Sequence, residues 1–325
     1  MSKPSVFITR AQNEPAATVL EKEFTVEIWP LNSPPPRHVM ETAVQSHSAL
    51  LTEAGDRIDA ALIGKAKGLK VIANKAIGTD NVDIAAASRN GIRVSNTPGL
   101  LEETCADMAF ALMLNVSCKV SFADRMVRAG LWTSFDITPY LGVDVHHKTI
   151  GIVGMGGIAK GVARRARGFS MQVLYWSRTR RPEAERELGL EWTPTLDSLL
   201  ECSDFVSLHV PLTAETRGLI GLPQFERMRS TAVLVNTARG AVVDHAALYS
   251  ALSARMIAGA GIDVVDPEPL PKDSPLLELP NIVITPHIGT ASRATFETMI
   301  MLAAANISAA LSGKPMPSCV NPEAR

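Results

Sequence analysis

The sequence lacks an excess of charge of either sign. Its 325 residues contain 32 Lys and Arg against 33 Asp and Glu, which gives a formal net charge of -1 at pH 7. A chain without a strong overall field does not attract nucleic acid or an anionic membrane over its whole surface. We therefore expect neither as a partner, and any basic cluster must act locally.

Long apolar runs are missing as well. Only a short apolar run precedes Arg10, which is too little for the core of a signal peptide. The most apolar segment, TFETMIMLAAANISAALSG, contains Glu297, Asn306 and Ser308, whereas a membrane helix needs roughly 20 apolar residues in succession. This segment is predicted to be a core helix, and the cytoplasm is the expected location.

The cysteines are few and do not form pairs. None of the four lies in a C-x-x-C motif or at the spacing of a metal site: Cys105, Cys118, Cys202 and Cys319. Scattered cysteines are typical of reduced thiols in an intracellular protein. We expect no metal centre.

What the sequence does contain is an alternation of β-branched runs and helical stretches, typical of parallel sheets with crossover helices. In the first hundred residues strands are predicted at Ser5–Ile8, Val26–Trp29, Ala60–Ile63, Lys70–Ala73 and Ile92–Ser95. A helix is predicted from about Glu102 to Val116. Six further strands are predicted within KTIGIVG, MQVLYWS, DFVSLHV, AVLVNT, AGAGIDVV and NIVITP. The last helical stretch has no sheet of its own and must pack on one formed earlier.

A glycine-rich turn follows the first strand of the second block. Gly154, Gly156 and Ala159 match the pattern G-x-G-x-x-G/A, in which the first glycine allows the turn and the second lets a pyrophosphate approach the backbone. A bare match is weak, but here a strand precedes it and a helix and a second strand follow. The context predicts a dinucleotide-binding site.

The second strand of this unit ends without the acidic residue that usually binds a ribose hydroxyl of NAD. Ser177 stands there, followed by Arg178, Thr179, Arg180 and Arg181. Hydroxyl groups and guanidinium groups donate to a phosphate and do not repel it, whereas solvated surface arginines are the plain alternative. The stretch favours NADP(H), and use of NAD(H) stays possible.

Three polar residues follow three later strands. Arg239, Glu268 and His287 each have an ordinary reading as a surface or loop residue when taken singly. Because the loops beyond parallel strands line one crevice, the three are expected to meet there. Together with a nicotinamide cofactor, they suit hydride transfer to a ketone.

Motifs along most of the chain resemble the D-isomer-specific 2-hydroxyacid dehydrogenases, of the glyoxylate/hydroxypyruvate reductase or 2-ketogluconate reductase type. The matching stretches are KVIANKAIGTDNVD, GIRVSNTPG, DVHHKTIGIVGMG, LHVPLT, NTARG, PHIG and CVNP. The resemblance implies an α/β protein with a Rossmann-type, doubly wound dinucleotide-binding domain at 101–287. It also implies a discontinuous, flavodoxin-like substrate domain at 1–100 and 288–325.

The resemblance also implies roles for individual residues. Arg239, Glu268 and His287 match the family's catalytic Arg, Glu and His, with His287 as the acid and Glu268 stabilising its charged form. Substrate binding is implied for Ile77, Gly78, Arg239 and Thr290. Cofactor binding is implied for Gly154, Gly156, Gly157, Ile158, Ala159, Ser177, Arg178, Thr179, Pro211, Thr216, Thr237, Ala238 and Asp263.

The expected activity is NADPH-dependent reduction of a small 2-ketoacid, such as glyoxylate or hydroxypyruvate, to a D-2-hydroxy acid. Phe296 stands where many relatives carry Arg, so reduction of 2-ketogluconate by the same machinery stays open. A remote alternative is a non-catalytic, corepressor-like dinucleotide sensor, which would not need all three catalytic groups. The resemblance further implies a homodimer formed through the helices after residue 102.

Overall fold

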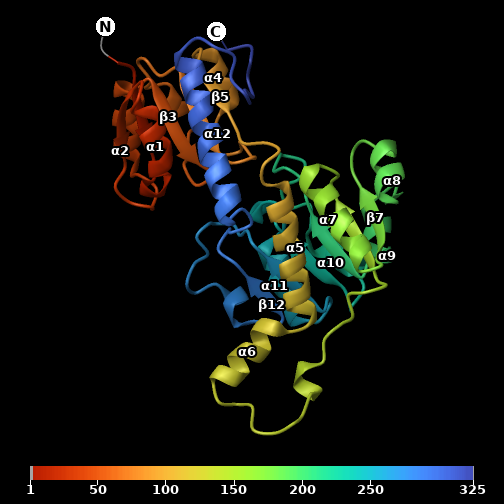
Figure 1. Cartoon of the computed structure of the whole chain (residues 1–325). Helices are drawn as coiled ribbons and strands as arrows, with labels where there is room; N and C mark the ends of the chain where they lie inside the picture. The colour runs from red at the N-terminus through yellow and green to blue at the C-terminus, as the bar shows by residue number, and fades with distance from the viewer. Residues whose placement is uncertain (1–2, 325) are drawn as a thin grey trace. The chain divides into compact units, whose positions relative to one another are not determined.

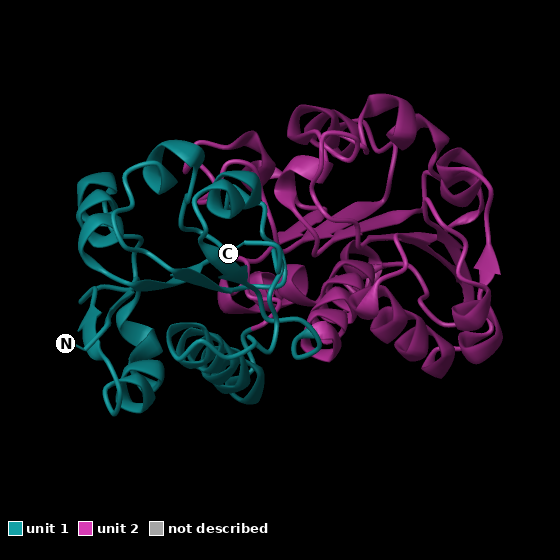
Figure 2. Cartoon of the chain, turned by 90° about the horizontal axis from the view of Figure 1, so that it is seen from above, with its two compact units in different colours: residues 1–101, 291–325 teal, residues 102–290 magenta. Residues whose placement is uncertain are grey.

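The computed structural model describes residues 3–324, which form two compact units (Figure 2). One unit consists of Met1–Leu101 together with Ala291–Arg325, and the other is Glu102–Thr290. The second boundary falls after Thr290, where the sequence suggested a boundary after His287. The segment at the C-terminus thus belongs to the same unit as the segment at the N-terminus.

The first unit is built on a parallel sheet with the order β2-β1-β3-β4-β5. Its strands are β1 (Ser5–Ile8), β2 (Thr25–Ile28), β3 (Ala49–Glu53), β4 (Val71–Lys75) and β5 (Arg93–Ser95). This is the flavodoxin-like order. Helix α12 (Arg293–Leu311) is long and apolar enough to cross a membrane by length and composition alone. Its Ile300 and Ile307 are nevertheless buried with Val6 and Leu51, so it is a core helix of this sheet (Figure 1).

One strand prediction in this unit is wrong. Ala60–Ile63 forms the short helix α3, because the Asp59 carboxylate accepts a hydrogen bond from the Leu62 N–H and caps its first turn. The sequence pattern did not predict the central strand β3 (Ala49–Glu53). This strand pairs in register with both β1 and β4. Leucine and alanine carry no strand signal of their own, and burial between two strands decides the conformation.

The second unit contains a seven-stranded sheet with the order β12-β11-β10-β9-β6-β7-β8. Its pairings are all parallel, which confirms the predicted fold class. The strands are β6 (Thr149–Val153), β7 (Gln172–Trp176), β8 (Glu191–Trp192), β9 (Phe205–Leu208), β10 (Val233–Asn236), β11 (Gly259–Ile262) and β12 (Ile282–Ile284). The order reverses between β6 and β9, the point at which such sheets bind ligands beyond their strand ends.

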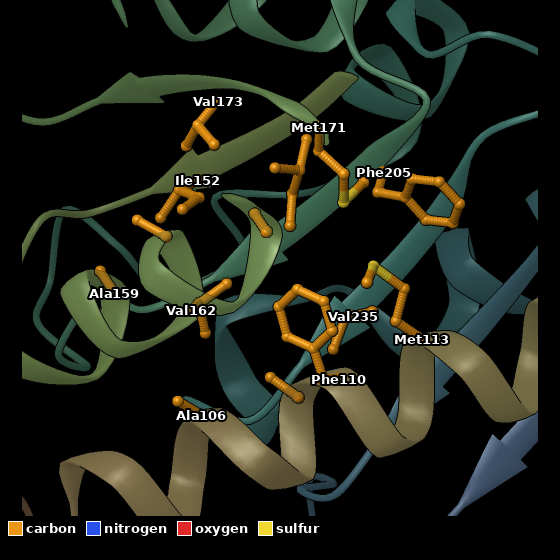
Figure 3. Close-up of a cluster of buried hydrophobic side chains, with 14 of the residues drawn as sticks. Ala106, Phe110, Met113, Ile152, Ala159, Val162, Met171, Val173, Phe205 and Val235 are labelled. Carbon is orange, nitrogen blue, oxygen red and sulfur yellow. The ribbon is translucent and has the colours of Figure 1, made fainter. Parts of the chain in front are cut away.

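Helices α5 (Glu102–Ser117) and α7 (Gly157–Gly168) cover one face of this sheet. Figure 3 shows Phe110 and Met113 of α5 and Val162 of α7 directed toward strand residues that include Phe205 and Val235. A Cβ on Gly161 would lie 2.9 Å from the Cβ of Ala106, so the two helices approach closely. This packing fixes the start of α7 above the ends of β6 and β9.

The remaining helices connect the strands of the two sheets. They are α1 (Glu14–Leu20), α2 (Arg37–Ser46), α4 (Ile84–Arg89), α6 (Val120–Arg128), α8 (Pro182–Leu188), α9 (Leu196–Cys202), α10 (Leu222–Arg227) and α11 (His245–Ser253). Four 3-10 turns occur at Ala11–Asn13, Thr138–Tyr140, Gly240–Val242 and Pro275–Glu278. The two-residue strand β8 and several of the short helices carry too few residues for a periodic pattern.

Candidate active site

The glycine turn after β6 has the form that a dinucleotide site requires. Gly154 has a φ of +97°, and a Cβ there would lie 2.5 Å from the His209 carbonyl oxygen. Only glycine fits this position without displacing the backbone after β9. The turn is therefore held close to the ends of β6 and β9.

Gly156 caps α7, and, apart from its own chain neighbours, no atom of residues 3–324 lies within 4 Å of the place where its Cβ would be. The open space allows a phosphate to approach the N–H groups at the helix start. Gly157 differs, because a Cβ there would lie 2.6 Å from Cγ of Glu102. Ile158 is half-buried and Ala159 is fully buried, which sets the close approach of α7 to the sheet. The residues present thus fit a dinucleotide pyrophosphate.

The basic loop after β7 lies beside this turn, because the Gly154 N–H donates to the Trp176 carbonyl at 2.8 Å. Within the loop, the Ser177 hydroxyl donates to the Thr179 carbonyl at 2.7 Å. The guanidinium of Arg178 is exposed. The pKa of Glu215 is lowered by a hydrogen bond from Thr213 and also by the charge of Arg178. The charge of Arg178 thus acts, as a minor cause, on a residue of the turn that follows β9.

The guanidinium of Arg180 is already bound within this unit. It makes two hydrogen bonds to Glu185, at 2.9 and 2.8 Å, and lies over the Trp192 ring. Tyr175 also donates to Glu185, at 2.6 Å. Of the arginines that the sequence suggested for a phosphate, this one braces the loop internally.

The turn after β9 is held by Thr216, whose hydroxyl donates to the Pro211 carbonyl at 2.6 Å and accepts from the Thr213 N–H at 2.8 Å. Its hydroxyl thus has two partners within the turn. Pro211 is exposed beside it. Thr216 maintains the shape of this turn.

Asn236, at the end of β10, positions the next loop. Its side chain accepts from the Ala238 N–H at 3.0 Å and donates to the Arg239 carbonyl at 2.9 Å, and Arg239 itself donates to the Ala238 carbonyl. A Cβ on Gly240 would lie 2.0 Å from the Val265 carbonyl carbon, so this loop packs on the one after β11. Sequence reasoning missed Asn236, although a buried amide at a strand end is a recognisable signal.

His287 and Glu268 meet as the sequence suggested. The His287 Nδ1 lies 2.9 Å from Oε2 of Glu268, and both side chains are more than one third exposed. The other oxygen of Glu268 accepts from the Val265 N–H at 3.0 Å. A carboxylate held in this way orients the ring and leaves Nε2 as the free edge of the imidazole.

The charge of Arg239 also acts on Glu268. Burial alone would raise the pKa of Glu268, but the bond with His287, the Val265 N–H and the charge of Arg239 together lower it. Burial and the charges of Asp263 and Glu102 raise the pKa of the Cys105 thiol to about 12, while Arg239 opposes this shift. Arg239 therefore lies within electrostatic reach of Glu268 and Cys105. Because the pKa of Glu268 is depressed, its charge is lost only when the pH falls through that lowered value.

Asp263 anchors the loop that carries His287. Its buried carboxylate accepts from the Thr285 hydroxyl at 2.6 Å, the Ile288 N–H at 2.9 Å and the Gly289 N–H at 2.7 Å. Its carbonyl accepts from the His287 N–H at 2.8 Å, and His287 has a φ of +55°, uncommon for a residue with a side chain. These bonds hold His287 in a conformation that a free loop would avoid. A carboxylate offers about four acceptor positions, so these three bonds leave one.

In the first unit, Ile77 and Gly78 follow β4. The Asn96 amide donates to the Ile77 carbonyl and the Asn74 amide donates to the Gly78 carbonyl, both at 2.9 Å. Asn74 is buried and also bonds Asn81. The loop is thus oriented by its carbonyl groups.

Comparison with known proteins agrees with this architecture. The family model for the D-isomer specific 2-hydroxyacid dehydrogenase NAD binding domain matches residues 110–289, more than half of the chain. The glyoxylate reductase of Korarchaeum cryptofilum is 47% identical over 322 residues, covering 99% of this chain and 97% of its own. The glyoxylate reductase of Thermococcus litoralis is 45% identical over 323 residues, covering 98% of this chain and 97% of its own.

Among solved structures, the NADPH-dependent glyoxylate/hydroxypyruvate reductase of Sinorhizobium meliloti, in complex with NADP and malonate, has a TM-score of 0.87 at 30% identity. The match covers 99% of this chain and 98% of that one. The TT0316 protein of Thermus thermophilus has a TM-score of 0.91 at 43% identity, covering 97% and 99% of the two chains.

The anchoring of the His287 loop can be tested with Asp263→Asn. The amide turns at least one acceptor into a donor that faces backbone N–H groups, so we expect the amides of Ile288 and Gly289 to exchange hydrogen about 10-fold faster or more. Hydrogen exchange with mass spectrometry checks this, and Asp273→Asn, at an exposed position of the same unit, is the control. Unchanged exchange in 285–289 would contradict the anchoring role.

Proposed function

The chain belongs to the D-isomer specific 2-hydroxyacid dehydrogenases, and from this premise we propose that it reduces glyoxylate and related small 2-ketoacids, such as hydroxypyruvate, to D-2-hydroxy acids. It is thus an oxidoreductase. The observation that carries the proposal is the His287–Glu268 pair at 2.9 Å within electrostatic reach of Arg239. A general acid and a fixed cation are the two groups that a ketoacid reduction requires of the protein.

His287 is the proposed general acid. NADPH, when bound, supplies the hydride, and the proton at Nε2 of His287 goes to the carbonyl oxygen of the substrate. Glu268 accepts from Nδ1 and so stabilises the charged ring that must give up this proton. Its depressed pKa keeps Glu268 ionised through neutral pH. The Asp263 anchor maintains the direction of the ring.

Arg239 is the proposed partner of the substrate carboxylate and of the ketone oxygen. A guanidinium stays charged and matches a carboxylate with two parallel donors. Substrate binding is proposed for the backbone of Ile77 and Gly78 and for Thr290. The substrate domain is then the unit that contains Ile77, and the dinucleotide-binding domain is the unit that contains Gly154.

Cofactor binding is proposed for the residues around the ends of β6, β9, β10 and β11. The N–H groups at Gly156, Gly157 and Ile158 would hold the pyrophosphate, since the start of a helix favours negative charge. Pro211, Thr216, Thr237 and Ala238 would border the cofactor. Asp263 would use its remaining acceptor position for the nicotinamide amide. Ala159 contributes by packing.

A preference for NADP(H) over NAD(H) is proposed from the loop after β7. The Thr179 hydroxyl and the exposed guanidinium of Arg178 would donate to the 2′-phosphate. The Ser177 hydroxyl would join them only by turning away from the Thr179 carbonyl, to which it donates in this structure. Arg180 is excluded from this role because Glu185 binds it. Arg181 is exposed and adds charge.

A homodimer is proposed through α6 and the loop after it. None of the residues of α6 is buried, and seven large apolar side chains in this region are exposed: Val120, Val127, Leu131, Trp132, Phe135, Ile137 and Leu141. Apolar residues gathered in this way mark an interaction surface, whereas single exposed ones do not. A second copy would cover them.

The proposed activity is tested by following NADPH oxidation with glyoxylate, hydroxypyruvate, 2-ketogluconate, pyruvate and oxaloacetate. We expect the highest kcat/KM with glyoxylate or hydroxypyruvate. His287→Ala should lower kcat by about 10²–10⁴, because the proton donor is lost, while His38→Ala, at an exposed position on α2, should retain activity. Normal turnover of the His287→Ala variant would remove this residue from the mechanism. A clear preference for 2-ketogluconate would establish the alternative substrate.

For the cofactor, the wild-type kcat/KM should be at least about 10-fold higher with NADPH than with NADH. The double variant Ser177→Asp/Arg178→Ala should lower the ratio about 100-fold, since a carboxylate repels the 2′-phosphate. Arg186→Ala, at an exposed position on α8, is the control and should leave the ratio within a few fold. Equal use of both cofactors by the wild type would refute the preference.

For the assembly, light scattering coupled to size-exclusion chromatography should give the mass of a dimer for the wild type. Trp132→Ser/Phe135→Ser should shift the population toward monomer, because two large apolar groups leave the contact. Leu31→Ser, at a residue that is 54% exposed in the other unit, is the control. A monomeric wild type at micromolar concentration would contradict the proposal.

A further inference from the structure

Two buried side-chain atoms at the ends of neighbouring strands have no hydrogen-bond partner within residues 3–324. They are Nδ1 of His209 and Oγ1 of Thr237. Leu208 and Asn236 are paired across β9 and β10, and His209 and Thr237 are the next residues on each strand. Their positions are therefore adjacent, at the strand ends where this fold binds its ligand.

Both residues belong to the face of the sheet that α5 and α7 cover. Alternation along β9 places Phe205, Ser207 and His209 on one side, and Ser207 Oγ lies 2.8 Å from Nε2 of His209. Alternation along β10 places Val235 and Thr237 on the same side as Phe205. Val235 and Phe205 belong to the apolar cluster that also contains residues of α5 and α7. His209 also lies beneath the glycine turn, because its carbonyl limits the space at Gly154.

The bond to Ser207 favours one of the two neutral tautomers of His209. Ser207 Oγ has its hydrogen bond with Nε2, and its hydroxyl hydrogen is satisfied only if Nε2 accepts. A neutral imidazole that accepts at Nε2 carries its proton on Nδ1. The unpaired Nδ1 is then a donor, and so is the Thr237 hydroxyl.

The His209 ring stays neutral under ordinary conditions. Burial lowers its pKa to about 3, so it does not titrate near neutral pH. A neutral donor adds a directed hydrogen bond at the site without adding charge. Arg239 and the start of α7 supply the positive potential in this part of the unit.

Leaving two donors buried without acceptors costs free energy, and folded proteins rarely retain such groups unless a ligand or a water satisfies them. A dinucleotide pyrophosphate and its adjoining ribose offer only oxygen atoms at this place, and all of them can accept. The open space at Gly156, beside the closed turn at Gly154, leaves room for a pyrophosphate near the ends of β6 and β9.

We propose that His209 Nδ1 and Thr237 Oγ1 form a donor pair that binds an acceptor oxygen of the dinucleotide at the junction of its pyrophosphate and the nicotinamide ribose. The proposal rests on the proposed function in assuming a bound dinucleotide. It adds His209 as a cofactor-binding residue and gives Thr237 a specific partner. A buried water in the same place is the competing explanation.

Two substitutions of His209 separate these explanations. An asparagine amide reaches the position of Nδ1, whereas a glutamine amide reaches the position of Nε2 and leaves Nδ1 empty. Dissociation constants for NADPH and for adenosine 2′,5′-bisphosphate are measured by fluorescence titration. The second ligand lacks both the pyrophosphate and the nicotinamide ribose, and so reports whether the rest of the site is intact.

We expect His209→Gln to weaken NADPH binding about 5- to 30-fold, with His209→Asn within about 3-fold of the wild type. Binding of adenosine 2′,5′-bisphosphate should not change in either variant. Thr237→Val should weaken NADPH binding to a similar extent, and the double variant with His209→Gln should lose less than the product of the two factors, because both donors share one oxygen. The melting temperature of each variant checks folding, and Thr237→Val keeps the test decisive if the His209 variants do not fold.

Unchanged NADPH affinity in both His209→Gln and Thr237→Val would overturn the proposal and leave the water explanation. Equal loss for both ligands would also overturn it, since it indicates general distortion. If the wild type itself binds no dinucleotide, the proposed function fails along with this inference, whereas a normal wild type with unaffected variants sinks the inference alone.

Discussion

The buried carboxylate of Asp263 is the constraint on which the site of the second unit depends. It binds Thr285, Ile288 and Gly289, and its own carbonyl binds the His287 N–H. A loop with a left-handed histidine is not stable by itself, and several short hydrogen bonds to one buried group overcome that preference. The direction of the His287 imidazole is therefore decided by a strand end, not by the loop.

The same principle recurs along this edge of the sheet. Asn236 holds the Arg239 loop by a donor and an acceptor, and Thr216 holds the turn after β9 in the same way. Each functional loop thus has a polar side chain from a strand end or from its own turn that satisfies its backbone. Two side chains at this edge differ, because His209 and Thr237 each have a buried polar atom without a hydrogen-bond partner in residues 3–324. The bound dinucleotide is the partner that we propose for them.

Much of the fold and of the candidate site could be predicted from the sequence, because the signals that indicate them lie within short stretches of the chain. The glycine pattern at 154–159 and the alternation of strands and helices predict a dinucleotide-binding sheet, and Arg239, Glu268 and His287 stand at three strand ends. Ala60–Ile63 was misread because four apolar residues do not distinguish a strand from a helix, and the cap at Asp59 decides between them. β3 was missed because its signal is its burial between β1 and β4.

The sequence alone determined the alternation of strands and helices along most of the chain, the family and the residues that can carry charge or protons, since these follow from residue type and spacing. Only the tertiary structure decided which of those groups are available. In the folded chain Arg180 is bound to Glu185, whereas Arg178 is exposed. Three acceptor positions of Asp263 are occupied by the loop that carries His287. Hydrogen bonding depends on distance and burial, and neither is written in the spacing of residues along a chain.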